Sequence, residues 1–353
     1  MIEDELRAAF ARHETLAPAT APIRAAIERT VVRRRRRRLR LRLGGTALAL
    51  VVAALVGVPA MTPDRPQQTA TLLLEPVPST PTGALNLLLL GLDGASPGGG
   101  RRADSILLVH VPADRSRLYL VSLPRDLQVP IPGVGTNKLN SSFAYGSMAG
   151  KGDLTHGYDL TRRVVTEVTG VPIDGGAVLT YSALRKLTDA VGGVPVCLPQ
   201  GIKSMHTRRV FPAGCQQLDG AASVDLLRQR HGLTDAVRDR DRNAQRYAAG
   251  LLRRIGERGG LTNPAMLHTL LTQAGSGLTV ETGETSLPAL LSVAGKAAAA
   301  EPVAVGLPVV YAEKPFFGFQ LDRATAPAFL AALGEDRLSE WTAAHPDRVT
   351  GLR

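Results

Sequence analysis

The stretch "LNLLLLGL", residues 85–92, is a continuous apolar run of the kind that forms a β-strand covered on both faces. Two more such runs follow closely, "SILLVHV" at 105–111 and "LYLVSL" at 118–123. The segment "ADRSR" between these two has the composition of a hairpin turn. We therefore predict three strands, of which the second and third are joined as a hairpin.

Helical and strand patterns alternate along the rest of the chain. Two further strands are predicted, "GGAVLTY" at 175–181 and "VAVGLPV" at 303–309. Helices are expected over 159–169, 182–191, 221–227, 240–257, 263–274, 286–299 and 324–333. This mixture indicates an α/β fold, a layered α-β-α domain over residues 85–340 with a tail at 341–353.

An uncharged stretch of 19 residues at 43–61 follows an arginine-rich segment at 1–42. A run of about 20 apolar residues spans a bilayer, and the preceding arginines orient the N-terminus toward the cytoplasm. A cleaved signal peptide has the same order of charges. Because the run is long and 42 residues precede it, we favour a single-pass membrane anchor. A Pro- and Thr-rich linker at 62–84 then leads to an extracellular domain.

The net charge of +11 does not indicate nucleic-acid binding. Residues 1–61 carry 12 basic and 5 acidic side chains, whereas the remaining residues carry 30 and 26. A nucleic-acid footprint would instead spread over a folded face. The only cysteines, Cys197 and Cys215, follow the anchor, so a disulfide is permitted, and two unpaired thiols are the alternative.

Three charged clusters interrupt the apolar runs, and the first contains two aspartates. Asp93 follows the strand at 85–92 and Asp104 precedes the strand at 105–111, with Arg102 beside them. If these strands are neighbours, both carboxylates meet at one sheet edge. Mg²⁺ accepts such a pair together with water and substrate phosphate oxygens. The alternative is two unrelated loop aspartates.

The second cluster is the adjacent pair Arg125-Asp126 at the end of the third strand. An arginine fixed at a strand end presents a planar fork to phosphate. Lys138 and Asn140 follow as further candidate anion contacts. A salt bridge that ends the strand is the alternative.

The third cluster lies in "LLRQRHGLTDAVRDRDRNAQRY", residues 226–247. Its candidate residues are Arg228 and Arg230, which share one face of an extended segment, and Asp239, Arg242 and Arg246, which share a helical stripe bordered by Gln245. Arg238 and Arg240 are expected to face solvent. A charged helix surface is the alternative. Together the clusters suit a pyrophosphate held by arginines and Mg²⁺, and no nucleophile motif indicates a covalent intermediate.

The segments "RADSILLVHV", "YLVSLPRDLQVPIPGVGTNKLNSSFAYG", "YSALRKLTDAVGGVPVCLP", "GCQQLDGAASVDLLRQRHG" and "DRDRNAQRY" resemble the LytR-CpsA-Psr family in order and spacing. The resemblance covers about 85–250 and, more weakly, the chain to about 340. It implies an LCP-type domain with a central mixed sheet and an apolar cavity for lipid. It also implies a phosphotransferase that moves a glycopolymer from an undecaprenyl-pyrophosphate carrier onto peptidoglycan.

The resemblance also implies roles for single residues. Asp93 and Asp104 would hold Mg²⁺, or Mn²⁺ in its place. The residues implied to bind pyrophosphate or take part in catalysis are Arg125, Arg228, Arg230, Asp239 and Arg242. From the clusters themselves we add Arg102, Lys138, Gln245 and Arg246 as pyrophosphate contacts and Asp126 as a catalytic carboxylate.

This chain departs from the family pattern at two places. Ala103 stands where serine is usual, and Gln245-Arg246 reverses the usual order. Asp235 or Asp241 could also take the role assigned to Asp239. In the expected reaction a sugar hydroxyl of peptidoglycan attacks the phosphorus, with Asp239 or Asp126 near it. The alternatives are a hydrolase that uses water as the acceptor and a non-catalytic, lipid-binding regulator.

Overall fold

The computed structural model describes residues 81–93, 101–150, 152–230, 232–233, 235–259, 263–313 and 317–352. The predicted cytoplasmic segment, the anchor at 43–61 and the linker up to residue 80 lie outside the described residues. Within the described ranges, no helix has the length and apolarity needed to cross a membrane.

Seven strands form a mixed central sheet in the order β11-β6-β1-β2-β3-β12-β15. They are β1 (Leu85–Leu92), β2 (Ala103–Val111), β3 (Tyr119–Ser122), β6 (Gly175–Thr180), β11 (Leu278–Glu281), β12 (Val303–Gly306) and β15 (Val349–Thr350). β1 pairs with β2 antiparallel and with β6 parallel, and β3 pairs with β12 parallel. The three predicted strands and the hairpin of β2 with β3 are confirmed, and β1 and β2 prove to be neighbours.

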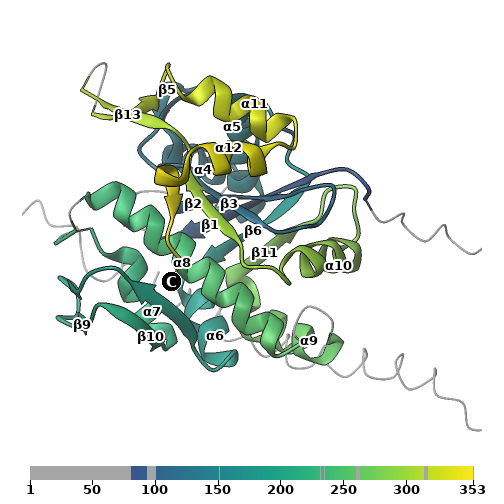
Figure 1. Ribbon diagram of the computed structural model, residues 1–353, viewed down its shortest axis with the longest axis vertical. Helices are drawn as coiled ribbons and strands as arrows, with labels where there is room; N and C mark the ends of the chain where they lie inside the picture. Colours follow the sequence, from purple (N-terminus) through teal and green to yellow (C-terminus); the bar gives the residue numbers. More distant parts are fainter. Residues whose placement is uncertain are drawn as a thin grey trace, which may run out of the picture. The chain divides into compact units, whose positions relative to one another are not determined.

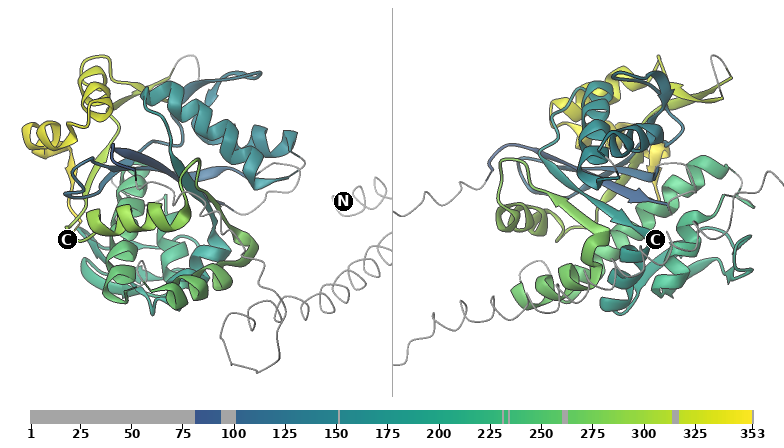
Figure 2. Two further views of the ribbon diagram at one scale, coloured as in Figure 1. Left: turned by 90° about the vertical axis from the view of Figure 1, so that its right-hand side faces the viewer. Right: turned by 180° about the vertical axis from the view of Figure 1, so that it is seen from behind.

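Helices cover both faces of this sheet (Figures 1 and 2). One face carries α4 (Leu139–Ala149), α5 (Leu154–Thr169), α11 (Ala326–Gly334) and α12 (Leu338–Ala344), and the other carries α8 (Ala236–Glu257) and α10 (Leu287–Ala297). A hydrophobic core lies on each face of the sheet, and alternate residues of β1 pack into the two cores. Leu88 and Leu90 belong to the first core, on the side of α4 and α5, and Leu87 and Leu89 pack against the second, on the side of α8 and α10. The predicted layered α/β fold is therefore confirmed.

A third hydrophobic core lies beneath α8. It is built from α6 (Tyr181–Ala190), α7 (Gly220–Arg228), α9 (Pro264–Ala274) and the antiparallel pair β7 (Val194–Leu198) and β10 (Gly214–Leu218). Cys197 and Cys215 face each other in that pair and form a disulfide, as the sequence permitted. Three small hairpins complete the fold: β4 (Gln128–Ile131) with β5 (Gly135–Lys138), β8 (Ile202–Lys203) with β9 (Val210–Phe211), and β13 (Val309–Ala312) with β14 (Gly318–Leu321).

The tail expected from residue 341 is instead part of the domain. Trp341 is buried in the first core, and β15 pairs antiparallel with β12 at the sheet edge. The folded domain therefore continues to Thr350, because α12 and β15 cover apolar surface at the β12 side of the sheet.

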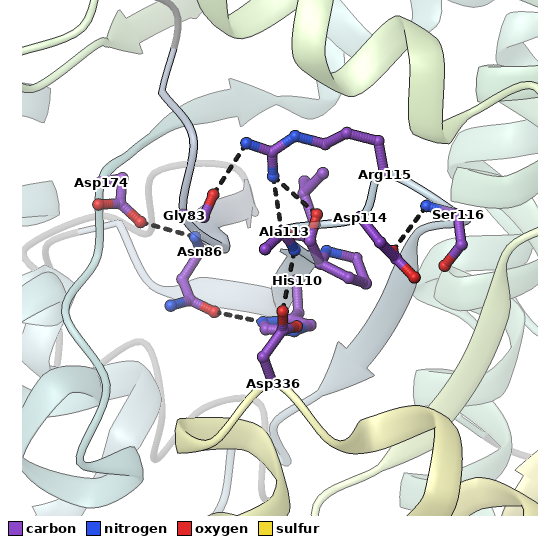
Figure 3. Close-up of polar contacts among 11 residues, drawn as sticks. Gly83, Asn86, His110, Ala113, Asp114, Arg115, Ser116, Asp174 and Asp336 are labelled. Carbon is purple, nitrogen blue, oxygen red and sulfur yellow. Dashed lines mark hydrogen bonds and ion pairs between the residues drawn. The ribbon is translucent and has the colours of Figure 1, made fainter.

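Polar contacts fasten the turn between the C-terminal helices to the sheet (Figure 3). On β2, the two ring nitrogens of His110 lie 2.9 Å from Asn86 Oδ1 and 2.8 Å from Asp336 Oδ1. Asp336, in the turn between α11 and α12, also accepts a hydrogen bond from the Ala113 amide at 2.9 Å. His110 thus links the centre of the sheet to a turn 226 residues further along the chain.

Candidate functional site

Three arginines from separate elements converge on Asp104 at the start of β2. Arg125 donates a short hydrogen bond from Nη1 to Asp104 Oδ1, and Arg240 donates another to the Asp104 carbonyl. Arg230 Nη2 lies 3.6 Å from Asp104 Oδ2. We call Arg125, Arg230 and Arg240, with Asp104 between them, the guanidinium cluster.

Strand register explains why Asp104 and Arg125 meet. Leu107 pairs with Ser122 in the antiparallel β2–β3 ladder, and the Leu123 amide donates to the Ile106 carbonyl at 3.0 Å. Continuing this register brings Asp104 opposite Arg125. The arginine that the sequence places after the third strand therefore lies beside Asp104, and its functional role stays a prediction.

Asp93 lies at the same end of the sheet. Leu92 pairs with Ala103, and the Asp93 Oδ1 accepts a hydrogen bond from the Arg102 amide at 3.1 Å. The structure thus brings both predicted metal aspartates to the ends of neighbouring strands. Among the described residues, no group of three or more His, Cys, Asp or Glu side chains could hold a metal. The Asp104 carboxylate is engaged by Arg125 and Arg230, and a magnesium site at this pair stays a prediction.

The guanidinium cluster carries uncompensated positive charge. Burial, together with the charges of Arg240 and Arg230, lowers the pKa of Arg125 to about 10. Burial and Arg240 also lower the pKa of Arg230. Buried Arg125 Nε makes no hydrogen bond to the described residues, and Asp126 Oδ1 lies 3.7 Å from it. A bound anion would supply the missing acceptor and offset the repulsion.

Asp126 faces Lys138 at the end of the β4–β5 hairpin. Lys138 Nζ lies 3.2 Å from Asp126 Oδ1, and both side chains are partly exposed. The Asn140 amide donates to the Arg125 carbonyl at 3.0 Å, and its buried side-chain Nδ2 has no partner among the described residues. These groups extend the polar site beyond the guanidinium cluster.

The charged segment at the start of α8 is arranged differently from the prediction. Arg240, expected in solvent, is only 5% exposed and belongs to the guanidinium cluster. Asp239 Oδ1 pairs with Nη1 of the exposed Arg242 at 2.9 Å instead. The helix begins earlier than predicted, at Ala236, with Asp235 as its N-cap. This earlier start sets which charged residues point inward.

Gln245 and Arg246 are not at the guanidinium cluster, contrary to expectation. The Gln245 Nε2 donates to the Leu120 and Val305 carbonyls at 3.0 and 2.8 Å, and its Oε1 accepts from Thr350 Oγ1 at 2.9 Å. Arg246 Nε donates to the Gly351 carbonyl at 3.0 Å. Both side chains fasten α8 to the sheet, so they are not free to bind pyrophosphate.

The remaining predicted arginines lie at the margin. Arg102 and Arg228 are exposed, and the charge of Arg228 acts on the buried hydroxyl of Tyr181. Burial raises the pKa of that hydroxyl. Both arginines can reach a bound anion only from outside the guanidinium cluster.

Two hollows adjoin at Tyr181. A polar hollow of about 500 Å³ is lined by Asp93, Arg101, Lys186 and residues 274–277. An apolar hollow of about 180 Å³ lies between the sheet and α6, α7 and α8, and Tyr181 lines both. The walls of the apolar hollow are Leu89, Leu90, Gly91, Ser105, Leu107, Ala177, Leu179, Leu184, Leu187, Leu227, Ala244, Tyr247, Ala248, Leu251 and Leu278. Tyr181, which lines the apolar hollow, lies close enough to the guanidinium cluster for the charges of Arg240 and Arg125 to act on its hydroxyl.

The model of the LytR_cpsA_psr family matches residues 60–299 of this chain. The chain belongs to this family. A cell wall biosynthesis protein, LcpA of Corynebacterium glutamicum, is 30% identical over 57% of this chain and 45% of its own length. The teichoic acid transferase TagU of Oceanobacillus iheyensis, named as acting between polyisoprenyl-teichoic acid and peptidoglycan, is 30% identical over 48% of each chain.

The aligned part thus spans less than half the length of these curated relatives. A solved structure of TagT bound to LI-WTA matches with a TM-score of 0.56 at 21% identity, over 72% of this chain and 90% of TagT. At that identity the match supports the shared fold alone.

Proposed function

We propose that this protein is a phosphotransferase that moves a glycopolymer from a polyprenyl-pyrophosphate carrier to peptidoglycan. One observation carries the proposal: Tyr181 lines the apolar hollow, and the charges of Arg240 and Arg125 of the guanidinium cluster act on its hydroxyl. A ligand that suits both has a multiply charged head and a hydrocarbon tail. The named activity of the TagU relative supports the same class of substrate.

The guanidinium cluster supplies the head-binding part. Arg125 is held at a strand end, Arg240 by a rigid helix, and Arg230 remains half exposed where a ligand can enter. A pyrophosphate would take the free Nε donor of Arg125 and offset the repulsion that lowers its pKa. The same positive charge then stabilises the prenyl phosphate that leaves.

The apolar hollow would take the first isoprene units of the tail, with Tyr181 at the boundary between head and tail. Asp93 and Asp104 would hold Mg²⁺ or Mn²⁺, which when bound would neutralise charge on the pyrophosphate. The proposal includes a single-pass anchor at 43–61 that holds the domain at the outer face of the membrane, because the lipid carrier and peptidoglycan meet at that face.

Catalysis then consists of positioning and charge stabilisation. A sugar hydroxyl of peptidoglycan attacks the phosphorus next to the glycopolymer, and the bond to the prenyl phosphate breaks. Phosphoryl transfer of this kind needs no covalent help from the protein. Arg125 and Arg240 are already fixed by Asp104, so little reorganisation is needed.

The test is turnover by the full-length chain of a prenyl-pyrophosphate-linked sugar with a peptidoglycan acceptor. We expect Arg125→Ala to lower the transfer rate by about 100-fold or more, since it removes one preorganised charge contact. Arg162→Ala, on the exposed side of α5, is the matched control and should behave as wild type. Undiminished transfer by Arg125→Ala contradicts the proposal. Sugar phosphate released to water is measured separately, because hydrolysis would use the same site.

A further inference from the structure

A second polar hollow, of about 170 Å³, lies next to the guanidinium cluster. Pro124, which precedes Arg125, forms part of its wall. The other lining residues are Ser122, Arg238, Asp241, Arg242, Gln245, Gly306, Leu307, Val309, Asp347, Arg348, Val349 and Thr350. α8 therefore borders both the guanidinium cluster, through Arg240, and this hollow, through Asp241.

Asp241 is an unusual carboxylate. It is 8% exposed, lines the hollow, and forms no hydrogen bond or ion pair with the described residues. By contrast, Asp239 pairs with Arg242, and Asp235 caps the helix. A buried carboxylate without a partner destabilises a fold, so a structural role does not explain Asp241.

Charged groups surround Asp241 on every side. Arg238, Arg240 and Arg242 belong to its own helix, and Asp235 lies at the N-cap. Arg125 and Asp126 approach from the turn after β3, and Asp347 and Arg348 come from the short 3-10 helix η4 (Pro346–Arg348). Burial raises the pKa of Asp241 to about 7. The negative charges of Asp126 and Asp235 also raise it, whereas the positive charges of Arg240 and Arg125 lower it. The carboxyl group is thus poised to exchange a proton near neutral pH.

We propose that this hollow receives the acceptor sugar and that Asp241 takes the proton of its attacking hydroxyl. This inference rests on the proposed function. The hollow offers arginine donors and carboxylate acceptors side by side, which matches the paired hydrogen-bonding needs of sugar hydroxyls. The oxygen–phosphorus bond forms as the bond from phosphorus to prenyl phosphate breaks. The proton passes to an Asp241 oxygen, and the leaving phosphate stays at the guanidinium cluster.

The test is Asp241→Asn in the full-length chain, assayed across pH 5.5–8.5. Transfer should fall by about 100-fold or more, as for loss of a general base. The transfer rate of the wild type should rise with pH through about 7, and the rate of the variant should not show this rise. Binding of farnesyl pyrophosphate, a probe of the donor site alone, should stay within about twofold, since Arg125 and Arg240 are untouched. Asp159→Asn, on the exposed side of α5, is the matched control.

The outcomes separate this inference from the proposed function. If wild type shows no transfer, or Arg125→Ala transfers normally, the proposed function fails. If Arg125→Ala is inactive while Asp241→Asn keeps full transfer and the rise of its rate with pH, the role proposed for Asp241 is wrong.

A second variant, Arg348→Ala, covers the case in which Asp241→Asn does not fold. It should raise the KM for the acceptor several-fold and leave farnesyl pyrophosphate binding unchanged. An unchanged KM would show that the acceptor sugar does not enter this hollow.

Discussion

At the scale of single residues, the linkage through His110 predicts how stability depends on pH. Burial lowers the pKa of His110 below 6.5, although Asp336 acts in the opposite direction. The folded state therefore prefers the neutral ring, so the stabilisation is complete above pH 6.5 and declines as the pH falls below it. The decline contributed by His110 can reach about 1.4 kcal/mol per pH unit.

Urea unfolding at pH 7.5 and 5.5 measures this contribution, with the His110→Gln variant as the comparison. The variant should lose less stability than wild type between the two pH values. His156→Gln, at an exposed position on α5, should keep the wild-type difference. If wild type instead gains stability from His110 in acid, the charge of Asp336 outweighs burial.

The sequence predicts some site residues better than others, for a physical reason. Asp104 and Arg125 follow from strand ends, because the period-2 register of a strand fixes where its terminal side chains lie. Arg240 and Asp241 do not follow, because α8 is charged around its whole circumference near its start. Because this first part of α8 has no apolar stripe, the residues that face inward there depend on the N-cap at Asp235 and on the contacts of Gln245 with the sheet.

At the scale of elements, the close crossing of α4 and α5 predicts a large effect of one methyl group. A Cβ added to Gly146 on α4 would lie 2.4 Å from the His156 carbonyl oxygen on α5. Because backbone must move, Gly146→Ala should destabilise the fold by about 1–3 kcal/mol. Gly256→Ala is the matched control, since a Cβ there meets nothing within 4 Å, and it should stabilise α8 by about 0.5 kcal/mol. Equal denaturation midpoints for the two variants would contradict this view of the crossing.

This crossing also explains why α4 was not predicted. Its sequence, "LNSSFAYGSMA", has small and polar residues at buried positions, among them Asn140, Ser142 and Ser147. Such residues permit close packing but leave no apolar periodicity to detect. The small hairpins and β15 were also missed, because two- to four-residue strands carry too short a pattern.

At the scale of the whole molecule, α8 connects every part of the proposed reaction. Arg240 reaches the guanidinium cluster and Asp241 reaches the acceptor hollow. One and two turns further along α8, Ala244 and Ala248 line the apolar hollow, while Gln245 fastens the helix to β3 and β12. A single rigid helix can therefore hold head, tail and acceptor in fixed relation, which is what positioning catalysis needs.

This arrangement predicts that the tail site can be closed without disturbing the head site. Ala244→Phe would fill part of the apolar hollow between α8 and the sheet. If the new ring displaces two methylene groups of the prenyl chain from the hollow, at about 0.8 kcal/mol each, farnesyl pyrophosphate should bind about tenfold more weakly. Inorganic pyrophosphate, which lacks a tail, should bind the variant as it binds wild type. Ala331→Phe, at an exposed position on α11, is the matched control. Equal loss of both ligands would mean that the substitution distorts the guanidinium cluster, and no loss of either would place the prenyl chain outside this hollow.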